Sequence, residues 1–443
     1  MKYENIAKDQ IINFSSEIKK ESFRPKSYGK VTSVVGSVIE SAGLEASIGE
    51  SYSIHSSNGK KVVAEAVGLK NGETILIPYD RVDGIKSGCL VEKVGQTLSV
   101  PVGAELLGRV LNANGEPIDN LGSIICRTKN PVYVQPPAPM ERKQIDKVMF
   151  TGIRAIDSLN TMGVGQRLGL FAGSGVGKSV LMGMIAKHSA ADVNVIALIG
   201  ERGREVQEFV TDSLGKDGIN RSVVVAVTSD MAAMSRIKGA FAATAIAEYF
   251  RDCGKNVLLM MDSVTRVAMA QREIGLASGE PPTTKGYTPS VFAVLPKLLE
   301  RAGKTEKGSI TGLYTVLVDN DDMNEPVADA VRSILDGHIV LSRRLAHKNH
   351  YPAIDVLQSV SRVMPKIISD EDRAVAMKAK ELLATYREAE DLINIGAYVK
   401  GSNPKIDEAI KKNQELVSFL IQDISENDFS DNPWESLKKI IQH

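Results

Sequence analysis

Cysteine, net charge and long apolar runs are all scarce in this sequence of 443 residues. The three cysteines, Cys89, Cys126 and Cys253, lie far apart and form no paired motif, which is typical of a reducing cytosol. No apolar run reaches the ~20 residues that a membrane-spanning helix needs, and the N-terminus lacks the apolar core of a signal peptide. We therefore expect a cytoplasmic protein that reaches a membrane only through partners.

The charges balance, with 54 Lys and Arg against 54 Asp and Glu, so no net field attracts the whole chain to nucleic acid or to an anionic membrane. Aromatic residues are also few. Between residues 28 and 95 they are limited to Tyr28, Tyr52 and Tyr79, without the interleaved basic and aromatic residues of a single-strand groove. We therefore expect no specific nucleic-acid partner.

Three changes of pattern divide the chain into four segments. Residues 1–27 carry apolar residues at helical spacing, which predicts a short amphipathic helix that either lies on its own domain or docks another protein. Residues 28–95 contain short β-rich pieces between Gly, Asn and Ser clusters, which predict a small β-barrel. Residues 96–365 alternate helical stretches with apolar runs typical of strands covered on both faces, and residues 366–443 predict a helical domain. The predicted fold is α/β with a mostly parallel sheet.

The stretch LFAGSGVGKSVLMGM, residues 170–184, packs glycines, a lysine and a serine between a predicted strand and a helix predicted to begin at Ser179. The glycines let successive backbone N–H groups turn inward around a phosphate, and the helix N-terminus adds partial positive charge. Lys178 would reach the β- and γ-phosphates, and the Ser179 hydroxyl would hold Mg²⁺. Ala172 replaces the usual first glycine, which is tolerable at a strand end with negative φ. The predicted phosphate-binding residues are Gly173, Ser174, Gly175, Val176, Gly177, Lys178 and Ser179.

Hydrolysis also needs a magnesium anchor and a group that positions water. NVLLMMD ends a buried strand with Asp262, whose carboxylate could face magnesium or could cap the next helix. LIGERGREV ends another strand with Glu201 and Arg202, the two catalytic candidates of this stretch. Glu201 could polarise the attacking water, or the two side chains could form a surface ion pair. Glu205 is not assigned to catalysis.

The stretch HYPAIDVLQSVSRVM supplies two further candidates. Tyr351, which precedes a proline, offers an aromatic face that could pack on adenine. Arg362 lies among serines, and composition alone favours a structural role for it.

Together, AGSGVGKS, IGERGREV, LLMMDS and PAIDVLQSVSR resemble the catalytic-head family of rotary ATPases, and the resemblance covers nearly the whole chain. GEPPTTKGYTPSVFAVLP and LINIGAYVKGSNPKIDEAI are similar to its flagellar protein export branch, one of the type III secretion ATPases. The resemblance implies a P-loop (RecA-like) nucleotide-binding domain, ATP and ADP as ligands, Mg²⁺ as the metal, and a homohexamer with nucleotide at the subunit interfaces.

By motif position, the resemblance makes Arg362 an arginine finger supplied to the γ-phosphate of the neighbouring subunit. Each site would then be complete only in a ring, which ties hydrolysis to assembly. The other implied roles are phosphate and magnesium binding for Lys178 and Ser179, water activation for Glu201, magnesium binding for Asp262 and adenine packing for Tyr351.

The resemblance further implies that ATP hydrolysis energises the unfolding and delivery of export substrates. The implied partners are a stator-like regulator on the N-terminal helix, a central coiled-coil stalk, export chaperone–substrate complexes and an export gate. The protein would then act at the cytoplasmic face of the inner membrane.

Four alternatives share parts of this pattern. The ATPase of a virulence-type secretion system shares fold and chemistry. An ATP synthase catalytic subunit is disfavoured because residues 366–443 lack its acidic DELSEED-type segment, and the large insertion of its vacuolar-type counterpart is absent before Thr151. A hexameric RNA translocase would need aromatic residues that the predicted barrel lacks. A non-catalytic ring subunit often lacks the water-positioning carboxylate, whereas Glu201 is present.

Overall fold

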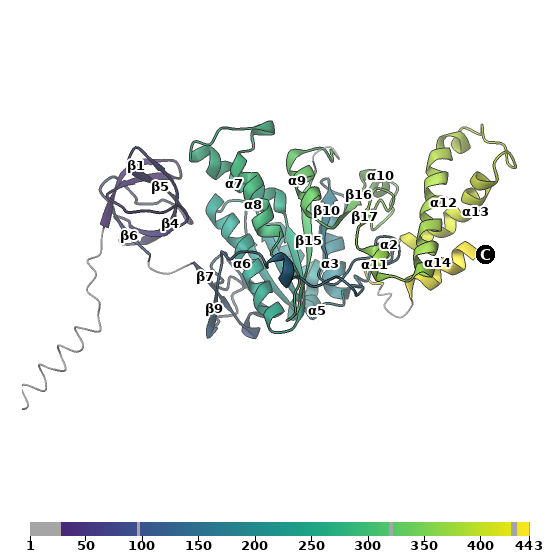
Figure 1. Ribbon diagram of the computed structural model, residues 1–443, viewed down its shortest axis with the longest axis horizontal. Helices are drawn as coiled ribbons and strands as arrows, with labels where there is room; N and C mark the ends of the chain where they lie inside the picture. Colours follow the sequence, from purple (N-terminus) through teal and green to yellow (C-terminus); the bar gives the residue numbers. More distant parts are fainter. Residues whose placement is uncertain (1–27, 95–97, 319–321, 427–431, 443) are drawn as a thin grey trace, which may run out of the picture. The chain divides into compact units, whose positions relative to one another are not determined.

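The chain folds into two compact units, Met1–Gln96 and Thr97–His443, each described by itself (Figure 1). The amphipathic helix predicted for residues 1–27 lies outside the described residues. Within the described parts, no helix combines the length and the apolar character that crossing a bilayer requires. The structure, a computed structural model, describes residues 28–94, 98–318, 322–426 and 432–442.

The first unit contains a closed antiparallel barrel. Its strands are β1 (Tyr28–Val35), β2 (Val38–Ala42), β3 (Ser51–His55), β4 (Lys61–Lys70), β5 (Glu73–Pro78) and β6 (Leu90–Lys93). They close in the order β1-β2-β5-β4-β3-β6. Every second residue along β4 from Val62 to Ala66 is buried, because successive strand residues point to opposite faces. Tyr52 and Tyr79 are also buried, so their rings are not presented for stacking with bases.

The second unit is built on one large sheet in the order β17-β16-β10-β15-β13-β11-β12-β8, with β14 beside β15. All neighbours along the order run parallel except β16 and β17, which are antiparallel like β14 and β15. This confirms the predicted α/β fold. The strands are β8 (Val110–Leu111), β10 (Arg167–Ala172), β11 (Val193–Ile199), β12 (Ser222–Val227), β13 (Asn256–Asp262), β14 (Gly303–Lys304), β15 (Ser309–Leu317), β16 (Gly337–Leu341) and β17 (Val360–Ser361).

Helices cover both faces of this sheet, so every residue of β11 and β12 is buried. Ile196 and Leu198 of β11 share one apolar cluster with Leu181 and Ile185 of α3. The long helix α6 packs against β11, β12 and β13 and against α7. The helices are α2 (Arg154–Leu159), α3 (Lys178–His188), α4 (Gly203–Glu208), a π-helical turn η3 (Phe209–Leu214), α5 (Gly215–Asn220), α6 (Ala233–Asp252), α7 (Val264–Ala277), α8 (Pro289–Leu299), α9 (Pro326–Ile334), α10 (Arg343–His347) and α11 (Met364–Ile367).

Short elements connect the sheet to the start of this unit. A two-stranded antiparallel pair, β7 with β9, contacts α6. The short elements are β7 (Ser99–Val102), β9 (Thr128–Pro131) and the 3₁₀ turns η1 (Ala104–Leu106), η2 (Pro139–Glu141) and η4 (Thr284–Gly286).

The unit ends in three helices, α12 (Asp370–Asn394), α13 (Pro404–Leu420) and α14 (Pro433–Gln442). Side chains cap two of these helices: Ser369 accepts a hydrogen bond from the Asp372 N–H, and Asn403 accepts one from the Lys405 N–H. These helices pack on α2 within the same apolar cluster that underlies the sheet. The domain boundary predicted after residue 365 stays a prediction.

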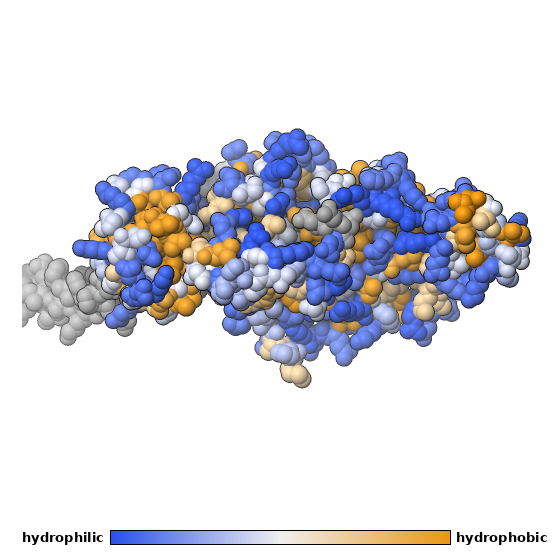
Figure 2. Space-filling view, turned by 90° about the horizontal axis from the view of Figure 1, so that it is seen from above, coloured by the Kyte–Doolittle hydropathy of each residue, from blue (hydrophilic) through white to orange (hydrophobic). Residues whose placement is uncertain are grey.

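Apolar side chains gather at the end of the α12–α13 hairpin where the two helices are connected (Figure 2). Leu392, Ile395 and Val399 are exposed there, close to the connection between the two helices. An exposed apolar cluster of this kind is typical of a surface that contacts another chain.

A buried ion pair ties α6 to the segment after α8. The Arg301 side chain is fully buried, and its Nε donates to Glu248 Oε1 at 2.8 Å while its Nη1 donates to the Val132 carbonyl at 2.7 Å. Removing the cation would leave a buried carboxylate without its partner.

We therefore expect Arg301→Met to lower the free energy of unfolding by about 3–5 kcal/mol. Urea denaturation followed by circular dichroism measures this change. Arg373→Met is the control, because Arg373 pairs with Asp370 on the surface and its loss should cost no more than about 0.5 kcal/mol. Equal stabilities of the two variants would contradict the importance of the buried pair.

Candidate active site

The glycine-rich loop joins the end of β10 to the start of α3, as the sequence predicts, although α3 begins at Lys178, one residue before the predicted start. Gly175 and Gly177 have φ values of 78° and 87°, which favour glycine. Ala172 is the last residue of β10 and is fully buried, so the alanine fits the strand end. Val176 is buried, so its side chain is not open to a ligand. The loop has the backbone shape of a phosphate cradle at a helix N-terminus.

The order of the strands brings the other candidates to the same edge. The carboxyl ends of parallel strands meet at one edge of a sheet, where ligands of open α/β sheets bind. Asp262 is the last residue of β13, and Leu198, near the end of β11, pairs with it. Glu201 follows β11 by two residues. Residues distant in sequence therefore converge beside the loop.

Lys178 is the centre of this convergence. Its ammonium forms an ion pair with Asp262 Oδ1 and lies 3.9 Å from Glu201 Oε1. All three side chains are at most 13% exposed. Asp262 does not cap the next helix, because the cap of α7 is the Ser263 hydroxyl, which accepts a hydrogen bond from the Arg266 N–H. A buried cation thus lies between two carboxylates at the phosphate loop.

The pKa of Glu201 lies near neutral pH. Burial raises the pKa of Glu201 to about 7, and the nearby Asp262 and Glu205 carboxylates add to the rise while Lys178 opposes it. The interaction with Glu201 in turn lowers the pKa of Glu205. Glu201 Oε1 is buried without a hydrogen-bond partner in the described structure. A carboxylate of this kind suits a group that orients or deprotonates water.

Tyr351 lies against the phosphate loop. A side chain added at Gly177 would come 3.4 Å from Cε1 of the Tyr351 ring, and the residue is 40% exposed. The Tyr351 carbonyl accepts a hydrogen bond of 2.9 Å from the Gln422 N–H at the end of α13. The tyrosine is therefore fixed beside the loop with part of its ring open to a ligand.

Two sequence candidates are not brought into this cluster. The Arg202 guanidinium is exposed and pairs with Glu205 at 3.5 Å. Arg362 follows β17 and lies beside Asp336, whose N–H bonds to Arg167 at the start of β10. The loop is at the other end of this six-residue strand, roughly 20 Å away at about 3.3 Å per residue.

Sequence reasoning missed two members of the cluster. Thr315 is fully buried in β15, and its hydroxyl donates to Asp262 Oδ1 at 2.7 Å. A lone threonine in the middle of the apolar run GLYTVLVD was the available signal. Glu205 was left out of catalysis, yet its carboxylate helps to raise the pKa of Glu201. Its position four residues after Glu201, on the following helix, was the only hint.

Comparison with known families agrees with this architecture. The nucleotide-binding domain of the ATP synthase alpha/beta family matches residues 152–361, and the beta-barrel domain of that family matches residues 31–95. The T3SS EscN ATPase C-terminal domain matches residues 368–439.

Several relatives match over most of their own length. The Flagellum-specific ATP synthase of Bacillus subtilis (strain 168) is 58% identical, with 90% of this chain and 92% of that protein covered. The protein of the same name from Treponema pallidum (strain Nichols) is 54% identical, with coverage of 92% and 91%. The Type 3 secretion system ATPase of Xanthomonas euvesicatoria is 51% identical, with coverage of 93% and 94%.

A solved structure is equally similar. The assembled ATPase EscN from the enteropathogenic E. coli type III secretion system superimposes with a TM-score of 0.89 at 47% identity. The alignment covers 93% of this chain and all of that one.

The chain therefore belongs to the ATP synthase alpha/beta family, and it is an ATP-hydrolysing P-loop enzyme. Both the C-terminal domain and the relatives assign it to the ATPases of type III protein export. Within these, the flagellum-specific relatives support the flagellar assignment made from the sequence.

The pKa of Glu201 predicts how activity depends on pH. The ionised form is the one that can act on water, so kcat/KM for ATP should rise as pH increases through about 7. Glu205→Gln removes a carboxylate that raises the pKa of Glu201, so the rise should move to lower pH. Glu208→Gln is the control, because Glu208 is exposed and pairs with Arg204. A flat profile between about pH 6 and about 8 would argue against this role.

Lys178→Ala should abolish hydrolysis, because it removes the cation that compensates the phosphates and leaves two carboxylates facing them. Steady-state phosphate release measures the loss, and Lys187→Ala at the far end of α3 serves as the control. Near-normal turnover of Lys178→Ala would refute the assignment of the loop.

Proposed function

We propose that this chain works as a ring motor, a homohexamer that hydrolyses ATP to energise the unfolding and delivery of flagellar proteins to a type III export gate. One observation supports the ring above all. The loop, Glu201 and Asp262 are gathered at one edge of the sheet, whereas Arg362 lies at the opposite end of β10. The positive charge that hydrolysis needs at the transition state would then come from another copy of the chain.

In this proposal the site contacts both the adenine base and the phosphates of the nucleotide. The half-exposed ring of Tyr351 packs on adenine, while the backbone N–H groups of residues 173–179 surround the phosphates. Lys178 turns from Asp262 toward the β- and γ-phosphates, whose charge replaces that of the carboxylate.

The oxygen donors at the loop fit Mg²⁺, which favours hard ligands. Ser179 is exposed in the first turn of α3, and the Asp262 carboxylate is oriented by Thr315 and Lys178. These two residues would hold the ion, directly or through its water shell. When bound, Mg²⁺ supplies positive charge at the β- and γ-phosphate oxygens.

Glu201 prepares the attacking water. In its ionised form it accepts a hydrogen bond from the water and orients it toward the γ-phosphate. The nearby Glu205 carboxylate raises the pKa of Glu201 and so influences the pH at which Glu201 ionises. Arg202, exposed beside them, is available to a ligand or a neighbouring subunit.

The proposed partners extend from the ring. EscN has been solved as an assembled ATPase and in complex with its central stalk EscO, which supports a homohexamer around a coiled-coil stalk here. We further propose a stator-like regulator on residues 1–27, export chaperone–substrate complexes, and the export gate at the cytoplasmic face of the inner membrane. The apolar end of the α12–α13 hairpin is one surface that such partners could contact.

A second candidate is the ATPase of a virulence-type secretion system. The 51% identity to the Xanthomonas euvesicatoria enzyme and the similarity to EscN favour it. The proposed chemistry is the same in both cases, and only the exported proteins differ.

Arg362→Ala tests the shared site. We expect nucleotide binding close to that of the unaltered chain and turnover at least ~10³-fold slower, because only transition-state charge is lost. Activity per subunit of the unaltered chain should also rise with protein concentration as rings form. Arg373→Ala, which removes an arginine paired on the surface, is the control. Constant activity per subunit together with an unaffected Arg362→Ala would place a complete site within one chain.

A further inference from the structure

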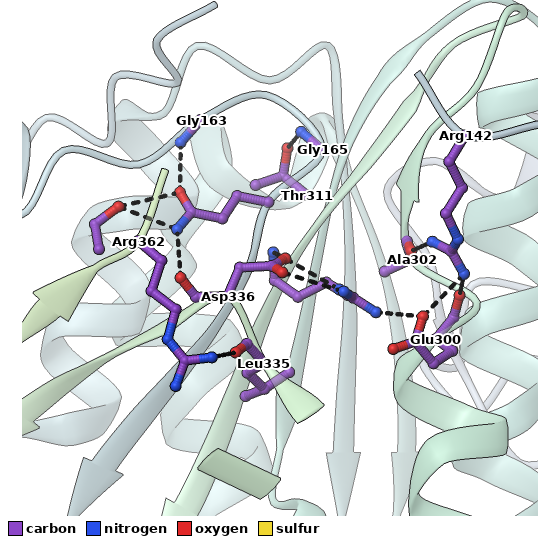
Figure 3. A network of polar contacts seen from close by, with 12 residues as sticks. Arg142, Gly163, Gly165, Glu300, Ala302, Thr311, Leu335, Asp336 and Arg362 are labelled. Carbon is purple, nitrogen blue, oxygen red and sulfur yellow. Dashed lines mark hydrogen bonds and ion pairs between the residues drawn. The ribbon is translucent and has the colours of Figure 1, made fainter. Parts of the chain in front are cut away.

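Arg362 combines a loosely held side chain with a firmly held backbone. Within the described residues, its guanidinium makes one recorded hydrogen bond, a long one of 3.4 Å from Nη1 to the Leu335 carbonyl (Figure 3). The residue is otherwise exposed. Its backbone N–H, in contrast, donates to the Asp336 carbonyl at 3.0 Å. The Arg362 guanidinium is therefore able to contact another molecule, while the backbone of the residue stays fixed.

Ser361, the residue before Arg362, holds this part of the backbone in place through hydrogen bonds. Ser361 Oγ donates to the Thr161 carbonyl at 2.7 Å and accepts from Gln166 Nε2 at 3.1 Å. The Met364 N–H also donates to it, at 3.3 Å. One small hydroxyl therefore joins β17 to the segment between α2 and β10.

Gln166 is the buried partner of that hydroxyl. Its side chain is fully buried, its Oε1 accepts from the Gly163 N–H at 2.8 Å, and its Nε2 also donates to the Asp336 carbonyl at 3.2 Å. Both ends of the amide are used, so its orientation is fixed. Gln166 and Asp336 thus hold the two residues, Ser361 and Arg362, that form the base of the finger.

A series of ion pairs stabilises the same end of β10 and β16. The Asp336 carboxylate accepts from Arg167 Nε and Nη2, each at 3.1 Å, and the Arg167 Nη1 lies 2.5 Å from Glu300. A side chain on Gly337 would come 2.3 Å from the Val360 carbonyl, so β16 and β17 are packed too closely for one. The base of Arg362 is held from three directions.

We propose that Ser361 and Gln166 are positioning residues for Arg362, which fix the direction from which its guanidinium reaches the neighbouring site. This inference rests on the proposed function of Arg362 as a finger. Because Gln166 precedes β10 and the phosphate loop follows it, one strand connects the site of its own chain to the finger offered to the next.

Ser361→Ala tests the inference with a change too small to disrupt the core. We expect kcat of the assembled full chain to fall about 10-fold with KM for ATP nearly unchanged, because a finger displaced by about 1 Å loses much of its effect on the transition state. Thr311→Val is the matched control. Its buried hydroxyl accepts from the Gly165 N–H at 2.9 Å close by, but does not bond to Ser361 (Figure 3). It should keep normal kcat.

The double variant Ser361→Ala/Arg362→Ala separates positioning from general structural support. If Ser361 acts through Arg362, the double variant is no slower than Arg362→Ala alone. Losses that multiply would overturn the inference, as would a normal kcat for Ser361→Ala. Gln166→Met, which keeps the shape of the side chain and removes its hydrogen bonds, should reproduce the same kcat loss and the same non-additivity. If Arg362→Ala itself leaves kcat unchanged, the proposed function fails, which is a distinct result.

Discussion

The ammonium group of Lys178, buried between two carboxylates, is the interaction on which the site depends. A buried cation is tolerated only with compensating charge, and here the Asp262 carboxylate supplies it, with Glu201 3.9 Å from the ammonium. In the proposed mechanism, Asp262 would bind magnesium and Glu201 would position water. Phosphates would take up the charge of Lys178, which would leave Asp262 free for the metal and Glu201 beside the γ-phosphate. The charge of Lys178 would therefore link the binding of ATP to its hydrolysis.

The second constraint is the direction of the parallel strands. Because they all run the same way, the phosphate loop, Asp262 and Glu201 are confined to their carboxyl edge. Arg362 is bound to Asp336 at the opposite end of β10, away from this edge. In the proposed ring, the Arg362 side chain of one subunit would reach the open site of the next.

How much of this could be predicted from the sequence depends on the range of the interactions. The loop is local, so AGSGVGKS specified its glycines, Lys178 and Ser179 directly. Asp262 and Glu201 were found because they end apolar strands. The contact of Ser361 with Gln166 spans 195 positions, and the raised pKa of Glu201 depends on burial. Neither has a local signal, so both required the folded chain.

The central claim is that each active site is shared between two chains, and subunit mixing tests it most directly. Lys178→Ala and Arg362→Ala chains are each expected to be inactive alone. Mixed in equal amounts, about a quarter of the interfaces would combine an intact loop with an intact finger from the neighbour. The account predicts that ATPase activity returns to roughly that fraction of normal. Mixed rings that form but stay inactive would contradict it.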